Sequence, residues 1–236
     1  MEDTFYESIW KRKLARPAAR EQGRREHEAL QLIGRGKTLL DIGCGNSIIA
    51  ELTRDRFLHA VGLDICMQPL TLLRSRNMSA LQSNLNRSGI PLKDGSVDTV
   101  VCLDVIEHVF DPLQLVREVW RVLRDGGEFI LTTPNTRFIR HLSQLIFKGR
   151  SPRTNLDQEG YDGGHLHYFT FADLKHLLTR FDFEIVAERG FAKRIYRSGK
   201  VYLFYLISKL WEKNTDREFF CQGILIKARK RPPRSF

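Results

Sequence analysis

From Lys37 onward, short apolar runs ended by turn residues alternate with amphipathic stretches. The apolar runs predict strands at Thr38–Ile42, Ala60–Asp64, Val97–Leu103, Glu128–Thr133, Phe183–Glu188 and Gly223–Ala228. The stretches between them predict helices at Ser47–Arg54, Pro69–Ser75, Pro112–Leu123 and Phe171–Phe181. Because the strands are apolar on both faces and alternate with helices, the pattern indicates an α/β fold whose mostly parallel sheet is covered on both sides.

This alternation begins late in the chain and is interrupted twice. Residues 1–36 predict a basic helical cap, because seven Lys or Arg residues stand against one acid, Glu21, between Lys11 and Arg25. Residues 37–236 predict one domain with insertions at 134–168 and 190–218. The second insertion contains an apolar, aromatic helix at Val201–Trp211, which is too short to span a membrane.

Composition narrows the class of protein and of partner. The 42% of apolar residues is ordinary for a globular protein and excludes a disordered or fibrous chain. The 38 Lys and Arg residues against 28 Asp and Glu residues leave a net charge of +10, which indicates an anionic partner. The four scattered cysteines form no CxxC pair, and the amino-terminal residues lack the apolar core of a secretion signal. We therefore expect a cytoplasmic protein, with peripheral membrane contact as an option.

The most informative local pattern is a glycine-rich turn between a strand and a helix, at Asp41–Gly45. The next predicted strand ends in an acid, Asp64, where a doubly wound fold presents a carboxylate to a ribose. The dinucleotide pattern GxGxxG is absent, because Ile48 stands at its third glycine. A carboxylate at Asp41 would repel a pyrophosphate and attract a cation, so the charge favours S-adenosylmethionine (SAM) over NAD.

These residues, with three later motifs, resemble the class I SAM-dependent methyltransferases of types 11 and 23, which include quinone-biosynthesis O-methyltransferases. The similarity covers roughly residues 37–190. The motifs in order are DIGCG at 41–45, Asp64, PLKDGSVD at 91–98, DVIEHV at 104–109, and LRDGG at 123–127 with TPN at 133–135. The resemblance implies a Rossmann-like sheet of seven strands with an antiparallel last strand, and methyl transfer from SAM.

The resemblance also implies where the cofactor lies. Gly43 and Gly45 should face its methionine part and Asp64 its ribose hydroxyls. Asn84 and Leu85 stand where the family has an acidic residue at the adenine, and the amide oxygen of Asn84 can still accept a hydrogen bond. The full predicted cofactor set is Asp41, Gly43, Cys44, Gly45, Asp64, Ile65, Asn84, Leu85 and Leu103.

Candidate chemistry centres on the Glu107–His108 pair after the third of the long apolar runs. His108 is placed to act as a general base toward a hydroxyl acceptor, although the pair could instead cap a helix and orient the loop. Asp104, Glu107 and His108, with His165 or His167, also form a donor set suited to Mg²⁺ or Mn²⁺. We predict Glu107, His108, His165 and His167 as catalytic residues and assign no metal ligand.

The acceptor is predicted from charge and from the second insertion. Basic residues at 137–153 and 189–200 suggest an anionic small molecule or glycan, or a lipid-linked acceptor if residues 190–211 contact a membrane. Two alternatives stay open at this point. One is a metal-dependent RNA 2′-O-methyltransferase, and the other is a SAM-binding module without catalysis.

Overall fold

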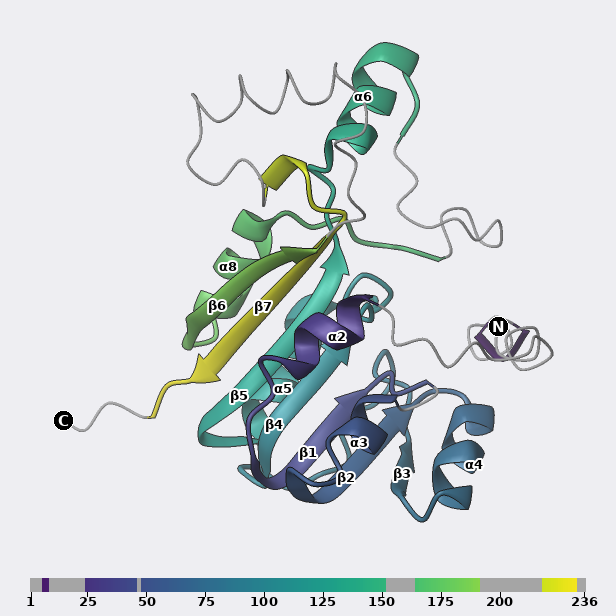
Figure 1. Cartoon of the computed structure of the whole chain (residues 1–236), viewed down its shortest axis with the longest axis vertical. Helices are drawn as coiled ribbons and strands as arrows, with labels where there is room; N and C mark the ends of the chain where they lie inside the picture. The colour runs from purple at the N-terminus through teal and green to yellow at the C-terminus, as the bar shows by residue number, and fades with distance from the viewer. Residues whose placement is uncertain (1–5, 9–23, 46–47, 152–163, 192–217, 233–236) are drawn as a thin grey trace.

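The structure, a computed structural model, describes residues 6–8, 24–45, 48–151, 164–191 and 218–232. These residues build a seven-stranded sheet in the order β3-β2-β1-β4-β5-β7-β6 (Figure 1). All neighbours are parallel except β7, which runs antiparallel to both β5 and β6. The strands are β1 (Gly36–Ile42), β2 (Phe57–Asp64), β3 (Ser79–Gln82), β4 (Val97–Leu103), β5 (Leu123–Pro134), β6 (Phe183–Phe191) and β7 (Gly223–Lys230). The predicted fold class is confirmed.

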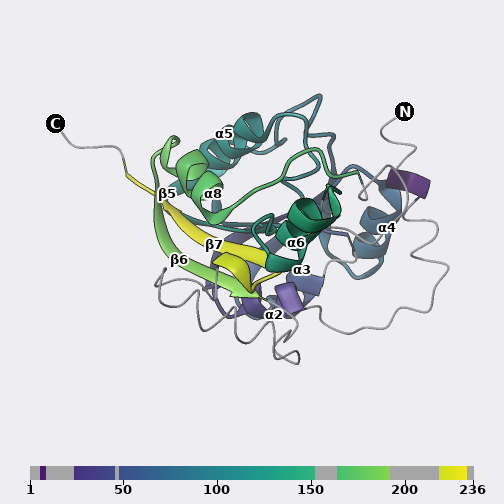
Figure 2. The same cartoon turned by 90° about the horizontal axis from the view of Figure 1, so that it is seen from above.

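Helices cover both faces of this sheet. They are α2 (Arg24–Leu30), α3 (Ile48–Leu52), α4 (Met67–Ser75), α5 (Pro112–Val122), α6 (Ile139–Lys148) and α8 (Phe171–Thr179). Successive strand side chains alternate between two cores: Leu40 packs with residues of α5 and α8, whereas Leu39 packs with residues of α2 and α3. Figure 2 shows α5 and α8 on one side of the sheet and α2 and α3 on the other.

Several helix ends follow from local sequence chemistry. Asp111 caps α5 by accepting hydrogen bonds from the amides of Leu113 and Gln114, and Pro112 fits the first turn. Thr170 and Asp173 form a reciprocal capping box at the start of α8. These caps explain why both helices begin at the predicted residues.

Two elements differ from the sequence expectation. The apolar runs did not locate the edge strand β3, because its four residues carry no apolar run and are partly exposed. Helix α6 lies inside the segment predicted only as an insertion at 134–168. The basic cap is described at residues 6–8 and from Arg24 on, and the predicted helix at 201–211 lies outside the described residues.

The topology places the site. Strand order reverses between β1 and β4, so the chain leaves the carboxyl ends of these two strands in opposite directions. A crevice opens at such a switch point in doubly wound sheets. The predicted functional residues follow the ends of β1, β2, β3 and β4, at this edge of the sheet.

Candidate functional site

The turn after β1 is shaped by two glycines with positive φ, 64° at Gly43 and 48° at Gly45. The amides of Gly43 and Cys44 donate to the carbonyl oxygen of Leu63, which ties the turn to the end of β2. A Cβ atom at Gly43 would lie 2.3 Å from the Cγ2 atom of Val105. Glycine is therefore required at position 43 both by backbone conformation and by the close approach of the loop after β4.

Asp64, at the end of β2, is buried and held by two backbone amides. Its Oδ2 atom accepts from Gly45 N at 3.0 Å, and its Oδ1 atom accepts from Cys66 N at 2.9 Å. A carboxylate oxygen can accept more than one hydrogen bond, and Asp64 lines the cavity described below. The acid thus links the glycine turn to the loop that follows β2.

A cavity of about 190 Å³ opens at this edge of the sheet. Five predicted cofactor residues line it: Gly43, Asp64, Ile65, Asn84 and Leu85. The other lining residues are Tyr6, Leu63, Ser83, Asn86, Asp104, Val105, His108 and Val109. The glycine cradle, the acid of β2 and the polar loop after β3 together suit a nucleoside with a cationic extension.

The remaining predicted cofactor residues, Asp41, Cys44, Gly45 and Leu103, are not among the lining residues. The side chain of Cys44 packs with Leu70 and Leu73 of α4, and burial raises the pKa of its thiol, so that it stays neutral. Leu103 packs on the core beneath α2 and α3, on the face that Leu39 also occupies. The backbone of Gly45 contributes through its bond to Asp64.

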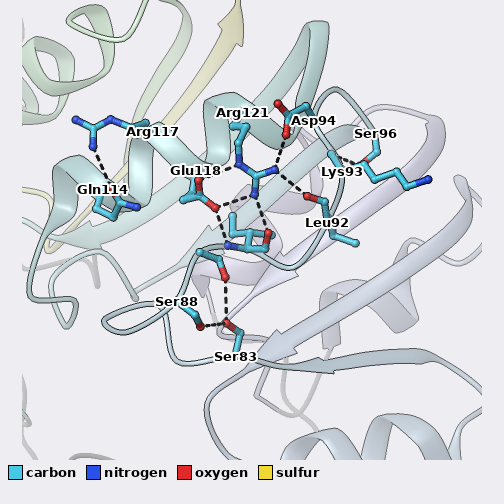
Figure 3. A network of polar contacts seen from close by, with 12 residues as sticks. Ser83, Ser88, Leu92, Lys93, Asp94, Ser96, Gln114, Arg117, Glu118 and Arg121 are labelled. Carbon is cyan, nitrogen blue, oxygen red and sulfur yellow. Dashed lines mark hydrogen bonds and ion pairs between the residues drawn. The ribbon is translucent and has the colours of Figure 1, made fainter.

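The loop between β3 and β4 supplies one wall of the cavity and is fastened to α5 (Figure 3). Arg121 of α5 donates to the carbonyl oxygens of Ile90 and Leu92 and to the carboxylate of Asp94. Glu118 receives two bonds from Arg121 and accepts from the amide of Ile90 at 2.8 Å. The loop is therefore held by two α5 side chains outside the cavity.

Within this loop, short-range bonds fix the polar residues at the cavity. The Ser83 hydroxyl bonds to Ser88 and to the carbonyl of Gly89. The Oδ1 atom of Asn84 accepts from the amide of Asn86, and the Oδ1 atom of Asn86 accepts from the amide of Phe110. These bonds place Asn84 and Asn86 at the wall of the cavity.

Acidic side chains gather around the glycine turn. Burial, followed by the neighbouring charge of Asp64, raises the pKa of Asp41 to about 8. The positive charge of Arg25, on α2, lowers the pKa of Asp41 and partly offsets this rise. Asp41 is therefore protonated at neutral pH, and a cation bound near the turn would favour its ionised form.

Asp104 follows β4 with a φ of 53°, which is uncommon for a residue other than glycine. Its Oδ1 atom accepts from the Thr132 hydroxyl at 2.6 Å, and its amide donates to the carbonyl of the same residue. Its Oδ2 atom accepts from Arg25. Asp104 thus lines the cavity as part of an ion pair and is not grouped with the histidines.

Glu107, His108 and His165 form a close cluster of side chains after β4. Their ligand atoms all lie within 4.8 Å of one another, and the rings of His108 and His165 meet edge to face at 4.6 Å. The carbonyl of Glu107 accepts from the amides of Leu166 and His167, which docks the 164–168 segment onto the loop after β4. His167 itself points elsewhere, with its Nε2 atom 3.3 Å from the carbonyl of Phe110.

His108 is the member of this cluster that lines the cavity. Its Nδ1 atom lies 3.1 Å from the carbonyl oxygen of Gly164, and Tyr6 meets its ring edge-on. Because a carbonyl only accepts, Nδ1 carries the proton in this contact and the lone pair of a neutral ring is at Nε2. The contact with Gly164 therefore fixes the ring in the tautomer whose Nε2 atom can accept a proton.

Glu107 is completely buried. Within the described residues, neither of its carboxylate oxygens has a hydrogen-bond partner, and Nε2 of His165 lies 4.0 Å away. Burial, with the charge of Asp104 adding to it, raises the pKa of Glu107 well above its ordinary range. A buried carboxyl group without partners is costly unless it is protonated or meets a cation.

The spacing of these donor atoms bears on whether they can hold a divalent metal ion. Ligand oxygens and nitrogens about 2.1 Å from Mg²⁺ or Mn²⁺ lie about 3 to 4 Å from each other. Glu107, His108 and His165 approach this spacing, and the two Glu107 oxygens have no competing hydrogen bonds among the described residues. The three side chains therefore fit a metal ion, whereas Asp104 and His167 are engaged elsewhere.

Part of the predicted acceptor region is described. Residues 135–151 include Arg137, Arg140, Lys148 and Arg150 on and around α6. Arg153 and nearly all of the second basic run and the 190–211 segment lie outside the described residues. Within the described part of the chain, we find no helix whose length and hydropathy would let it cross a membrane.

Comparisons with known proteins show the family of this chain. A family model described as a methyltransferase domain matches residues 10–188. A probable S-adenosylmethionine-dependent methyltransferase of Mycolicibacterium smegmatis is 40% identical over 100 residues, which cover 42% of this chain and 39% of that protein. The ubiquinone biosynthesis O-methyltransferase of Aliivibrio fischeri is 30% identical over 117 residues, covering 47% of this chain and 50% of the relative. The chain thus spans about half or less of the length of these curated relatives.

Among solved structures, an S-adenosylmethionine-dependent methyltransferase from Mesorhizobium loti superposes with a TM-score of 0.61 at 17% identity. The match covers 88% of this chain and 99% of that one, and at this identity it shows the fold alone. The family model covers most of the predicted domain, so the predicted family and cofactor class are confirmed. The relatives that this chain matches include a probable SAM-dependent methyltransferase. The chain belongs to the family of methyltransferase domains.

Proposed function

We propose that this chain transfers a methyl group from SAM to a hydroxyl oxygen of a small-molecule, glycan or lipid-linked acceptor. The observation that carries the proposal is that one cavity is lined by both Asp64 and His108. A carboxylate that can accept hydrogen bonds from a ribose and a histidine that can accept a proton therefore face the same cavity. The similarity to ubiquinone biosynthesis O-methyltransferases supports an oxygen acceptor.

The cofactor residues would act by position. Bound SAM supplies an electrophilic methyl group on a positively charged sulfur. Asp64 would accept hydrogen bonds from the ribose, while the amides of the glycine turn and the 83–86 loop would enclose the remainder. Methyl transfer needs little covalent assistance, so orientation of the acceptor accounts for much of the acceleration.

His108 would remove the hydroxyl proton of the acceptor. Its Nδ1 contact with Gly164 holds the ring with Nε2 as the proton acceptor. Glu107 and His165 stand behind it, and an ionised Glu107 would stabilise positive charge on either ring. We therefore assign His108 as the base and Glu107 and His165 as positioning residues.

The same three side chains would hold a divalent metal ion, which would polarise the acceptor hydroxyl as a Lewis acid. This alternative is favoured by the partnerless Glu107 oxygens within the described residues. Titration with Mn²⁺ followed by electron paramagnetic resonance would test it directly. Binding in the wild type and in His167→Gln, but not in Glu107→Gln or His165→Gln, would support the metal; no binding in the wild type would remove it.

The test of the function measures transfer of a tritiated methyl group from SAM. The acceptors to offer are a water-soluble catechol, a polyprenyl-linked phenol, an oligosaccharide and a short RNA. His108→Gln should lower kcat by about 10²–10⁴-fold while leaving the affinity for S-adenosylhomocysteine unchanged by calorimetry. His167→Gln is the matched control and should retain activity.

Other outcomes would change the assignment. Turnover only with RNA, falling steeply with salt, would favour an RNA methyltransferase. Binding of S-adenosylhomocysteine without turnover on any acceptor would favour a binding module. Loss of cofactor binding in His108→Gln would contradict its role as a base.

A further inference from the structure

Helix α6 is firmly anchored at its amino-terminal end. Phe138, just before the helix, is fully buried, and His141 is buried with its ring edge-on to Phe138. The Nδ1 atom of His141 lies 3.1 Å from the carbonyl oxygen of Asn135. The Asn135 amide nitrogen in turn donates to the carbonyls of Glu218 and Cys221, ahead of β7. The root of α6 is therefore part of the folded core.

The other end of α6 projects its apolar side chains into solvent. The exposed fractions are 51% for Leu145, 68% for Ile146 and 82% for Phe147. The helix stops at Gly149, which has a left-handed conformation. Three consecutive large apolar residues at an exposed helix end are unusual on a protein surface, and such a patch marks an interaction site.

The charged residues next to this end along the described chain are all positive. Lys148 and Arg150 follow the apolar residues, and Arg140 lies two turns earlier. No acidic residue occurs anywhere in the sequence from 129 to 156. We call Leu145, Ile146 and Phe147, together with Lys148 and Arg150, the α6 tip. An apolar helix end followed in the chain by Lys148 and Arg150 is complementary to an anionic lipid surface, where apolar groups enter the acyl boundary and cations meet headgroups.

The position of the α6 tip matches such a partner. Helix α6 stands beyond the carboxyl ends of β4 and β5, the edge that also carries the site (Figure 1). A surface contacted by α6 would therefore lie at the carboxyl ends of the strands, where the cavity also opens. No crossing helix is needed for this contact, because an interfacial helix lies in the headgroup region.

We propose that the α6 tip docks the protein onto a membrane surface that contains anionic lipids. Leu145, Ile146 and Phe147 enter the interface, and Lys148 and Arg150 contact headgroup phosphates. This inference concerns location and does not depend on which acceptor is methylated. It is distinct from the predicted contact through residues 190–211.

The test is co-sedimentation of the full chain with vesicles of phosphatidylcholine alone and of phosphatidylcholine with phosphatidylglycerol. We expect binding to the anionic vesicles that weakens as salt rises. Ile146→Gln/Phe147→Gln should weaken binding about tenfold or more, and Lys148→Gln/Arg150→Gln about fivefold for each charge removed. The matched control is Leu58→Gln, because Leu58 is 76% exposed on β2 and lies in a different element; it should bind like the wild type.

A second measurement reports insertion itself. Because the chain already has three tryptophans, the emission of Phe147→Trp is compared with that of the wild type. The added tryptophan should contribute a shift to the blue on anionic vesicles and additional quenching by brominated lipid. Three results would overturn the proposal. One is an absence of wild-type binding, and another is equal binding by Ile146→Gln/Phe147→Gln. The third is that this double variant lowers the melting temperature or dissociates an oligomer while vesicle binding persists, because α6 would then be covered by its own chain or by a second copy.

Discussion

The guanidinium of Arg25 donates to the Oδ2 atom of Asp104 at 2.5 Å, and it also contacts Glu26 at 2.7 Å. The two partners come from α2 and from the loop after β4, 79 residues apart. Because Asp104 lines the cavity, a residue of the basic amino-terminal region sets the charge balance of the site.

Replacing Arg25 with Met should leave Asp104 and Glu26 without their cation. Since Arg25 is part-exposed, we expect the free energy of unfolding to fall by about 1–2 kcal/mol, less than for a fully buried pair. Urea denaturation measures this change. Arg35→Met is the control, because the Arg35–Asp55 pair is largely exposed and its loss should change stability by less than about 0.5 kcal/mol. Equal stability of Arg25→Met and the wild type would contradict the argument.

The raised pKa of Asp41 predicts that the free energy of unfolding depends on pH. Burial raises its pKa to about 8 from an ordinary value of 3.8, so the folded chain retains a proton that the unfolded chain has lost. Between these two values, ionisation favours unfolding, and the contribution of Asp41 to stability falls as pH rises. Asp41→Asn cannot ionise and should therefore gain stability relative to the wild type from pH 5 to pH 9.

Urea unfolding of both proteins at pH 5, 7 and 9 gives this difference. Other titrating groups, such as Glu107, are present in both proteins and largely cancel in the comparison. A difference in stability that stays constant across the three pH values would show that the pKa of Asp41 is not raised.

Arg121 lies outside the cavity, but we expect its contacts to influence the affinity for the cofactor. Arg121→Met removes its bonds to Ile90, Leu92 and Asp94, so the loop that carries residues 83–86 keeps only the bond from the Ile90 amide to Glu118 among these contacts with α5. We expect the affinity for S-adenosylhomocysteine to fall about tenfold, corresponding to roughly 1.4 kcal/mol. Arg117→Met, one turn earlier on α5, removes a bond to Gln114 and serves as the control. Equal affinities for the two variants would show that the Arg121 contacts do not shape the cavity.

The close approach of Gly43 to Val105 predicts that a larger residue at position 43 would clash, and that a smaller residue at position 105 would relieve the clash. Gly43→Ala should lower the free energy of unfolding by about 1–3 kcal/mol, because its Cβ atom would overlap Val105 and its φ is positive. Val105→Ala removes the overlapping methyl group. The double variant should thus recover part of the stability and cofactor affinity, whereas additive losses in thermal melts and calorimetry would rule out the clash.

The alternation of apolar runs and amphipathic stretches was enough to locate six of the seven strands and four of the helices, because a buried strand requires a run of apolar residues. The number of strands and the antiparallel last strand were implied by the family resemblance. The glycine turn at 43–45 and Asp64 were likewise visible, since backbone conformation and strand ends impose local residue choices. The edge strand β3 was not located in this way, because a half-exposed strand of four residues needs no apolar run. The α6 helix was hidden within a segment whose basic residues suggested only an insertion.

Which histidine joins Glu107 depended on tertiary structure. His165 and His167 are chemically alike and two residues apart, and no local pattern separates them. The carbonyl of Glu107 accepts from the amides of Leu166 and His167, and this long-range pairing turns His165 toward the cluster and leaves His167 near Phe110. Tyr6 and Arg25 reach the site in the same way, through contacts across the fold. Local backbone and burial requirements are written in the sequence, whereas contacts between distant segments arise only when the sheet brings those segments together.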